Sequence, residues 1–312
     1  MKKILLTVLL SVFMAEASYG SVEVVATIFP VYDWVKEISK GSDVNINLLL
    51  DSGVDLHSFQ PAVDDMVKIA KCDVFVYVGG ESDEWVEDSL KNVVNKNQVS
   101  INLLKILGDK VKSEEIVEGM EHEHEHHEHE HEHEHESESD EHIWLSLRNA
   151  EIICKYIAEK LSELDENNKE IYSQNCSEYV KKLSELDSEY DEVIDKSMRK
   201  ILLFADRFPF RYMSDDYGLK YYAAFSGCSA ETEASFETVI FLSKKVDELK
   251  LPYVLTIDGT KHKIAETVIS NTKSKNQKIL VLDSMQSTTL NNNTSYLEIM
   301  QKNLETLKTV LN

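Results

Sequence analysis

Residues 61–80 have the sequence PAVDDMVKIAKCDVFVYVGG, in which a helical pattern leads directly into a strand pattern. The run Asp73–Val78, apolar after its first residue, ends at Gly79 and Gly80, as expected of a strand buried on both faces. The apolar residues before it recur at the spacing of one helix face: Val63, Met66, Val67 and Ala70. A helix that feeds such a strand is typical of βαβ units, in which helices cover a parallel sheet.

The same alternation extends outward in both directions. Toward the N-terminus we expect strands at Val22–Phe29 and Val44–Leu50 with a helix at Val31–Lys40 between them, and a further helix at Asp83–Val94 follows residue 80. Beyond residue 200 the pattern predicts strands at Lys200–Phe204, Leu219–Ala223, Tyr253–Ile257 and Ile279–Leu282. It predicts helices there at Phe208–Tyr217, Phe236–Leu249, His262–Asn271 and Tyr296–Leu311.

Two helical stretches, Ser146–Leu161 and Asp165–Arg199, separate these halves. The second has no Pro or Gly and is longer than most helices inside compact domains. We therefore predict an α/β protein with two Rossmann-like lobes, residues 21–162 and 200–312, joined by one rigid helix at 163–199. Open α/β sheets bind ligands beyond the carboxyl ends of their strands, so a site is expected in the cleft between the lobes.

Charge and length restrict the function. The 312 residues carry a formal net charge of −23. This excess of acid argues against nucleic-acid binding, because a phosphate backbone requires a Lys/Arg surface. It also disfavours an anionic membrane surface, and it suits a cationic ligand.

The first twenty residues form a pattern of their own. Lys2 and Lys3 precede an apolar run, Ile4–Met14, that is too short to span a bilayer. Small residues that suit cleavage follow, which predicts a secretory signal ending near residue 17 or 20. No cysteine adjoins that point, so we expect an exported periplasmic protein without a lipid anchor or a stable membrane insertion.

Residues 121–136 are a low-complexity run of alternating His and Glu without any apolar residue. We expect a solvated loop that gathers metal ions weakly, and less so below about pH 6, where imidazole is protonated. We do not expect it to be the high-affinity site. Its histidines are His122, His124, His126, His127, His129, His131, His133 and His135.

Four residues outside that run are candidate ligands of a tight metal site. His57 lies in a turn-rich loop after a predicted strand, and His142 precedes an amphipathic helix. Asp206 and Asp283 each follow a predicted strand, although Asp283 could cap a helix and Asp206 could pair with Arg207. Two imidazoles with carboxylate suit the tetrahedral geometry of zinc.

The four cysteines give no metal-binding pattern. Cys72 and Cys154 are expected to be small core residues, and the spacing cannot assign disulfides to them, to Cys176 or to Cys228. Because the chain contains no CxxC pair, we do not expect thiolate ligands.

Nearly the whole mature chain resembles the zinc/manganese family of solute-binding proteins that serve ABC transporters. The segments that carry the resemblance are VVATIFPVYDWVKEI (24–38), GVDLHSFQPAVDDMVKIAKCDVFVYVGG (53–80), DEHIWLSLRNA (140–150), LDENNKEIYSQNCSEYVKKLSELDSEY (164–190), YGLKYYAAFSGCSAETEAS (217–235) and KILVLDSMQS (278–287). The acidic, His-rich insertion also lies where zinc-type members have theirs.

The resemblance implies a monomer that captures zinc between its lobes and delivers it to an ABC permease. The family's metal positions fall on His57, His142 and Asp283. A further family position falls near Ala205, which cannot ligate; Asp206 is next to it, and Glu231 or Glu233 are alternatives. Manganese remains an alternative ligand, since carboxylate-rich sites suit it.

Other functions remain open at this stage. An adhesin of the same fold, or a metal buffer acting through the His/Glu run, would have a similar sequence. A secreted zinc hydrolase is less favoured, because no HExxH motif and no assignable general base are present. The chain is therefore not expected to be an enzyme.

Overall fold

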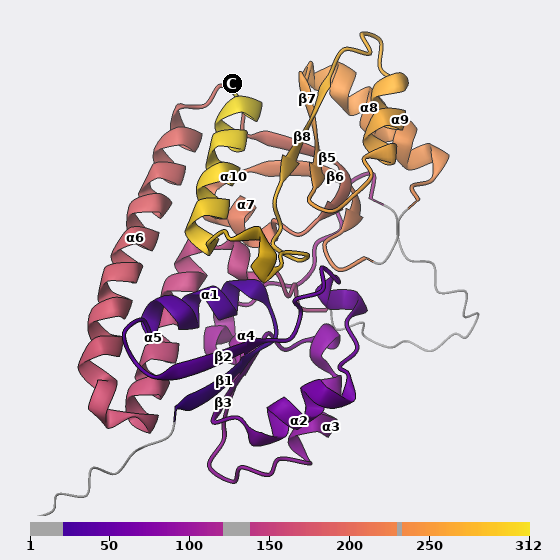
Figure 1. Ribbon diagram of the computed structural model, residues 1–312. Coiled ribbons are helices and arrows are strands. Elements are labelled where there is room, and N and C mark those ends of the chain that lie inside the picture. The colour runs from indigo at the N-terminus through magenta and orange to yellow at the C-terminus, as the bar shows by residue number, and fades with distance from the viewer. Residues whose placement is uncertain (1–20, 121–137, 230–232) are drawn as a thin grey trace, which may run out of the picture.

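The computed structural model describes residues 21–120, 138–229 and 233–312 (Figure 1). The predicted signal, the His/Glu run with its eight histidines, and Glu231 lie outside the described residues. The described chain forms two α/β lobes, each built on a four-stranded parallel sheet, which confirms the predicted fold class. Among the described residues, none of the helices combines the length and the apolar composition that crossing a bilayer requires.

The N-terminal sheet has the strand order β2-β1-β3-β4, and the C-terminal sheet has the equivalent order β6-β5-β7-β8. Each order places a topological switch point between two central strands, where ligands of open α/β sheets bind. The N-terminal strands are β1 (Val22–Ala26), β2 (Val44–Leu48), β3 (Val74–Tyr77) and β4 (Val99–Asn102). The C-terminal strands are β5 (Ile201–Phe208), β6 (Lys220–Ser226), β7 (Tyr253–Ile257) and β8 (Lys278–Leu282).

The helices lie close to their predicted places. In the first half they are α1 (Phe29–Ile38), α2 (Val63–Lys71), α3 (Trp85–Leu90), α4 (Leu103–Leu107) and α5 (Leu147–Leu164). In the second half they are α6 (Lys169–Lys196), α7 (Arg211–Tyr217), α8 (Phe236–Leu249), α9 (Lys263–Ser270) and α10 (Tyr296–Val310). Short 3-10 helices at Leu56–Ser58 and Ile143–Leu145 fix the backbone beside the two candidate histidines.

The long helix α6 has 28 residues and runs alongside both lobes (Figure 1). At 1.5 Å per residue its length is about 42 Å. It packs against α5 and α1 at one end and against α10 at the other. Its buried residues recur every three or four positions, which is the face that it presents to the lobes: Tyr172, Cys176, Tyr179, Leu183, Leu186, Tyr190 and Ile194.

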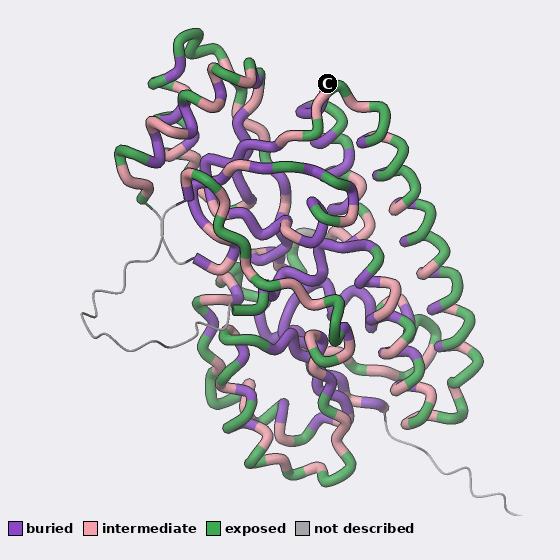
Figure 2. The backbone as a smooth tube through the Cα atoms, turned by 180° about the vertical axis from the view of Figure 1, so that it is seen from behind, coloured by how far each residue is buried: buried purple, intermediate pink, exposed green. Residues whose placement is uncertain are grey.

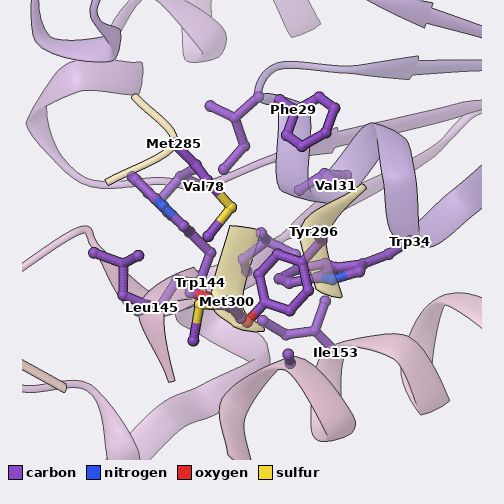
Figure 3. Close-up of a cluster of buried hydrophobic side chains, with 14 of the residues drawn as sticks. Phe29, Val31, Trp34, Val78, Trp144, Leu145, Ile153, Met285, Tyr296 and Met300 are labelled. Carbon is purple, nitrogen blue, oxygen red and sulfur yellow. Dashed lines mark hydrogen bonds between the residues drawn. The ribbon is translucent and has the colours of Figure 1, made fainter. Parts of the chain in front are cut away.

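One apolar core continues from the N-terminal lobe into the C-terminal lobe. Figure 3 shows Trp34 and Trp144 packed with Tyr296 and Met300 from α10, and Figure 2 shows how the buried backbone runs between the lobes. Trp34 and Tyr296 meet edge to face, with ring centroids 5.1 Å apart. Tyr296 donates its hydroxyl to the Trp144 carbonyl, and the Trp144 indole donates to the Ser284 carbonyl. These contacts hold the lobes together beside the predicted site.

Candidate metal centre

His57 and His142 come from opposite ends of the N-terminal lobe sequence and meet at the boundary between the lobes. Their Nε2 atoms are 3.2 Å apart. His57 lies in the 3-10 turn after β2, where Asp55 caps the turn by accepting a hydrogen bond from the His57 amide. His142 is fully buried just before the turn that leads into α5. The structure therefore brings the two predicted histidines together.

The Nδ1 atom of each ring has a partner of its own. Nδ1 of His142 lies 2.9 Å from Oδ1 of Asp140. Since a carboxylate only accepts, this nitrogen carries the proton and leaves the Nε2 lone pair free. Nδ1 of His57 lies 2.7 Å from the Ser82 hydroxyl and 3.7 Å from Oε2 of Glu141, a negative charge that favours a proton there. The Nε2 atoms of both rings thus face the space between them, and that of His142 does so with its lone pair.

Cys228 is the third member of this group. One ligand atom each from His57, His142 and Cys228 all lie within 4.8 Å of one another. Cys228 follows the end of β6, and its amide donates to Glu114 at 2.9 Å. Gly227 makes this approach sterically feasible, because a Cβ there would lie 3.0 Å from the His142 ring. The cluster therefore contains ligand atoms from both lobes.

Gln286 closes the side of the cluster that faces β8. Its Nε2 lies 2.8 Å from Nε2 of His142, so the amide donates to the free lone pair of that ring. The Ser284 hydroxyl donates to the side-chain carbonyl oxygen of Gln286. The residue between them, Met285, has φ = 60°, a left-handed conformation that is unusual for a side chain of this size. Such strain is often found in loops that position functional groups.

Burial controls the charge of these groups. Desolvation lowers the pKa of His57 to about 3, and the neighbouring His142 adds to this effect, so the imidazole is neutral. Desolvation also raises the pKa of Glu141 and of the Cys228 thiol above their ordinary values. Neutral imidazoles are the form that binds metal.

The two predicted carboxylates lie outside this group. Asp206 accepts hydrogen bonds from Thr260 at 2.9 Å and from the Ile257 amide at 3.3 Å, both within the C-terminal lobe. Asp283 accepts from the Met285 amide at 2.8 Å, and burial raises its pKa to about 6. Neither belongs to the described set of ligand atoms that includes His57 and His142.

The Arg207 side chain pairs with Asp55 and not with the adjacent Asp206 that the sequence suggested. Its guanidinium contacts Asp55 of the opposite lobe at 2.6 Å, and only its backbone amide bonds to Asp206. Asp55 therefore links the His57 backbone to the C-terminal lobe.

Sequence analysis did not single out Cys228, which the structure places beside the two histidines. The absence of a CxxC pair argued against thiolate ligands, but that motif describes sites held by one local segment. A usable signal was present, because Cys228 lies two residues beyond the end of a strand and Asp283 lies one residue beyond the end of another. Ligands of open α/β sheets bind beyond the carboxyl ends of the strands, and both residues lie at such ends.

The chain is similar to known proteins of zinc uptake. Residues 24–310 match the family model described as "Zinc-uptake complex component A periplasmic". The chain is 30% identical over 322 residues to the zinc-binding protein AdcA of Streptococcus pyogenes serotype M3, covering 98% of this chain and 61% of that protein. It is 30% identical to the high-affinity zinc uptake system protein ZnuA of Bacillus subtilis, covering 94% of this chain and 89% of that protein.

Solved structures give the same result. The Zn(II)-bound ZnuA-like domain of Streptococcus pneumoniae AdcA superimposes with a TM-score of 0.72 at 27% identity, covering 94% of this chain and 99% of that chain. The metal-dependent lipoprotein YcdH of Bacillus subtilis has a TM-score of 0.74 at 26% identity, covering 93% and 99%. A family match over almost the full length shows that the chain belongs to the ZnuA family, the periplasmic component A of zinc-uptake complexes.

Proposed function

We propose that this protein captures Zn(II) between its two lobes and delivers it to an ABC permease for uptake. The observation that carries the proposal is the pair of Nε2 atoms 3.2 Å apart, with both Nδ1 atoms engaged elsewhere. Two nitrogens bound to one tetrahedral zinc at 2.0–2.1 Å would be about 3.3 Å apart. The rings are therefore already spaced for a shared zinc ion.

The wider role rests on the sequence and on the relatives. The signal-like residues 1–20 support export, and an ATP-driven permease is the expected partner of a component A protein. The chain spans about three fifths of the length of the first streptococcal relatives. The His/Glu run would act as an auxiliary loop that concentrates zinc near the inter-lobe site.

Competitive calorimetry of the full chain and of a variant without residues 121–136 tests this proposal, with zinc and manganese as ligands. We expect one tight zinc site that survives the deletion. His57→Ala should abolish it, whereas His262→Ala is the matched control, since His262 bonds to Thr256 away from the site. If only weak, multiple binding is found and it disappears with the run, the protein is a metal buffer and the proposal is wrong.

We propose a binding role instead of a hydrolytic one. The acids nearest the rings hold protein groups: Asp140 binds His142, and Glu141 accepts the Ser82 amide at 2.9 Å. Among the described residues Oε2 of Glu141 has no hydrogen-bond partner, but it lies 3.7 Å from Nδ1 of His57, on the side of the ring opposite Nε2, so neither carboxylate faces the proposed zinc position as a general base must. Assays with ester and peptide substrates should show no zinc-dependent turnover, and turnover that His57→Ala removes would contradict this role.

A further inference from the structure

We infer that Cys228 binds the captured metal directly, as a thiolate, and that two imidazole nitrogens and one sulfur therefore make the site selective for zinc over manganese. This inference rests on the proposed function and specifies its chemistry. No local cysteine motif suggests it; the fold alone brings this residue to the two histidines.

Geometry is the first argument. In a tetrahedral site, a sulfur 2.3 Å from zinc and a nitrogen 2.0–2.1 Å from it are about 3.6 Å apart. The ligand atoms of His57, His142 and Cys228 already lie within 4.8 Å of one another. A shift of about an ångström at the β6 loop would complete the geometry. Glu114 accepts a hydrogen bond from the Cys228 amide, and Gly227 leaves room for the loop beside the His142 ring.

Charge is the second argument. Imidazole binds metal in its neutral form, so the two rings leave the double charge of zinc unchanged, and the Arg207 guanidinium near His57 adds a positive charge to the surroundings. Asp140 is hydrogen-bonded to Nδ1 of His142, and Oε2 of Glu141 lies 3.7 Å from Nδ1 of His57, so both carboxylates lie on the sides of the rings opposite the Nε2 atoms. Asp55 is occupied by Arg207. Within the described cluster, Cys228 is the group that can bring a negative charge into contact with the ion.

Selectivity follows from ligand softness. Thiolate and imidazole ligands suit zinc, whereas manganese prefers carboxylate, carbonyl and water oxygens. As the sulfur–zinc bond forms, the S–H bond breaks and its proton passes to solvent, so each captured ion releases one proton from Cys228. No electrons are transferred, because zinc is not redox-active.

Cobalt(II) titration of the full chain tests the assignment, because cobalt bound to thiolate has a sulfur-to-metal charge-transfer band in the near ultraviolet. We expect this band in the wild type and its loss on adding one equivalent of zinc. The His/Glu run cannot produce the band, since it contains no cysteine. Cys228→Ser should remove the band and weaken tight zinc binding more than about tenfold, while changing manganese affinity little.

Cys176→Ser is the matched control, because Cys176 lies on α6 and contacts the Cys154 carbonyl away from the cluster. It should retain the band and the affinity. A measurement on the unaltered protein avoids any folding defect: zinc should protect Cys228 from alkylation by iodoacetamide, as located by peptide mass spectrometry.

The outcomes separate the two proposals. If the wild type binds zinc tightly but shows neither the cobalt band nor protection of Cys228, the thiolate assignment is wrong and zinc capture stands. If the wild type has no tight zinc site, the proposed function fails, and the assignment fails with it.

Discussion

Gln286 donates its amide to the atom of His142 that we assign to the metal. A zinc ion must displace this donor, because a lone pair cannot accept a hydrogen bond and coordinate a metal at the same time. The Gln286 amide thus competes with the metal for the lone pair of His142 Nε2. A side chain without an N–H donor at position 286 would not compete.

Gln286→Glu should therefore tighten zinc binding by about tenfold, because a carboxylate oxygen close to the same position can serve as a fourth ligand. Competitive titration against a chelator measures the change. Gln174→Glu, which adds the same charge on the exposed face of α6, is the control and should leave affinity unchanged. Weaker binding in Gln286→Glu would mean that this side chain does not face the ion.

Asp140 acts on the metal through His142. Its carboxylate holds the ring by the Nδ1 proton and also accepts the His142 amide at 2.8 Å. Asp140→Asn should reduce zinc affinity by about 10–100-fold, since such partners set the tautomer and basicity of the ligand. The test is zinc affinity at neutral pH alongside the thermal midpoint of the metal-free protein. Unchanged affinity would show that Asp140 has only a structural role.

At the scale of elements, Asp33 joins the two ends of the chain. It lies on α1, is 1% exposed, and accepts a hydrogen bond at 2.9 Å from the amide of Tyr296, the first residue of α10. Burial raises its pKa to about 6, and Glu37 adds to this. A raised carboxyl pKa contributes stability that is complete below the unfolded value of 3.8 and is lost as the pH rises through about 6.

Asp33→Asn should keep the hydrogen bond and remove this pH dependence. Between about pH 5 and pH 7.5 the variant should gain about 1–2 kcal/mol of unfolding free energy relative to the wild type. Urea denaturation of both proteins at the two pH values, without metal, measures the difference. Asp83, whose pKa burial raises to about 7, is present in both proteins and cancels. If the difference in unfolding free energy between the variant and the wild type were the same at both pH values, Asp33 would be ionised at both.

Sequence reasoning recovered most elements because their apolar periodicity is strong. Phe236–Leu249 and Tyr253–Ile257 were predicted with the bounds that the structure has. The strand at Val99–Asn102 and the helix at Leu103–Leu107 were missed, because each is four or five residues long and the strand is only partly buried. Segments this short contain too few residues for a period to be distinguished.

The site was harder to predict because its members converge through the relative placement of the lobes. His57 and His142 could be singled out by residue type, whereas the only signal for Cys228 was its position after a strand, which it shares with other residues. Strand ends identified several candidates on the C-terminal sheet, but no sequence pattern determines which of them reaches across to the histidines.

At the scale of the whole molecule, the boundaries of the two apolar cores do not coincide with the boundary between the lobes. The main core includes α1, α5, α6, α10 and both sheets, whereas a smaller cluster lies between the C-terminal sheet and α8 and α9. Members of the smaller cluster include Val239, Leu242, Val246, Ala265 and Val268. Separate cores tend to open separately.

Hydrogen exchange should therefore be slowest in α1, α5 and α10 together and faster in α8 and α9. Deuterium uptake by peptides of the metal-free protein provides the measurement. If protection instead divided at the lobe boundary, with α10 exchanging like α8, the continuous core would not be the cooperative unit.

The continuous core also limits how such a protein can recombine with its relatives. A crossover within α6 would join one parent's α1 and α5 to another parent's α10, and contacts such as Trp34 with Tyr296 would have to match by chance. The helices α8 and α9 pack in the smaller cluster instead, so exchanging their outer surfaces disturbs the main core less. Lineages of this fold can therefore vary the outer helices of the second lobe more freely, whereas α1 and α10, which share the main core, must evolve together.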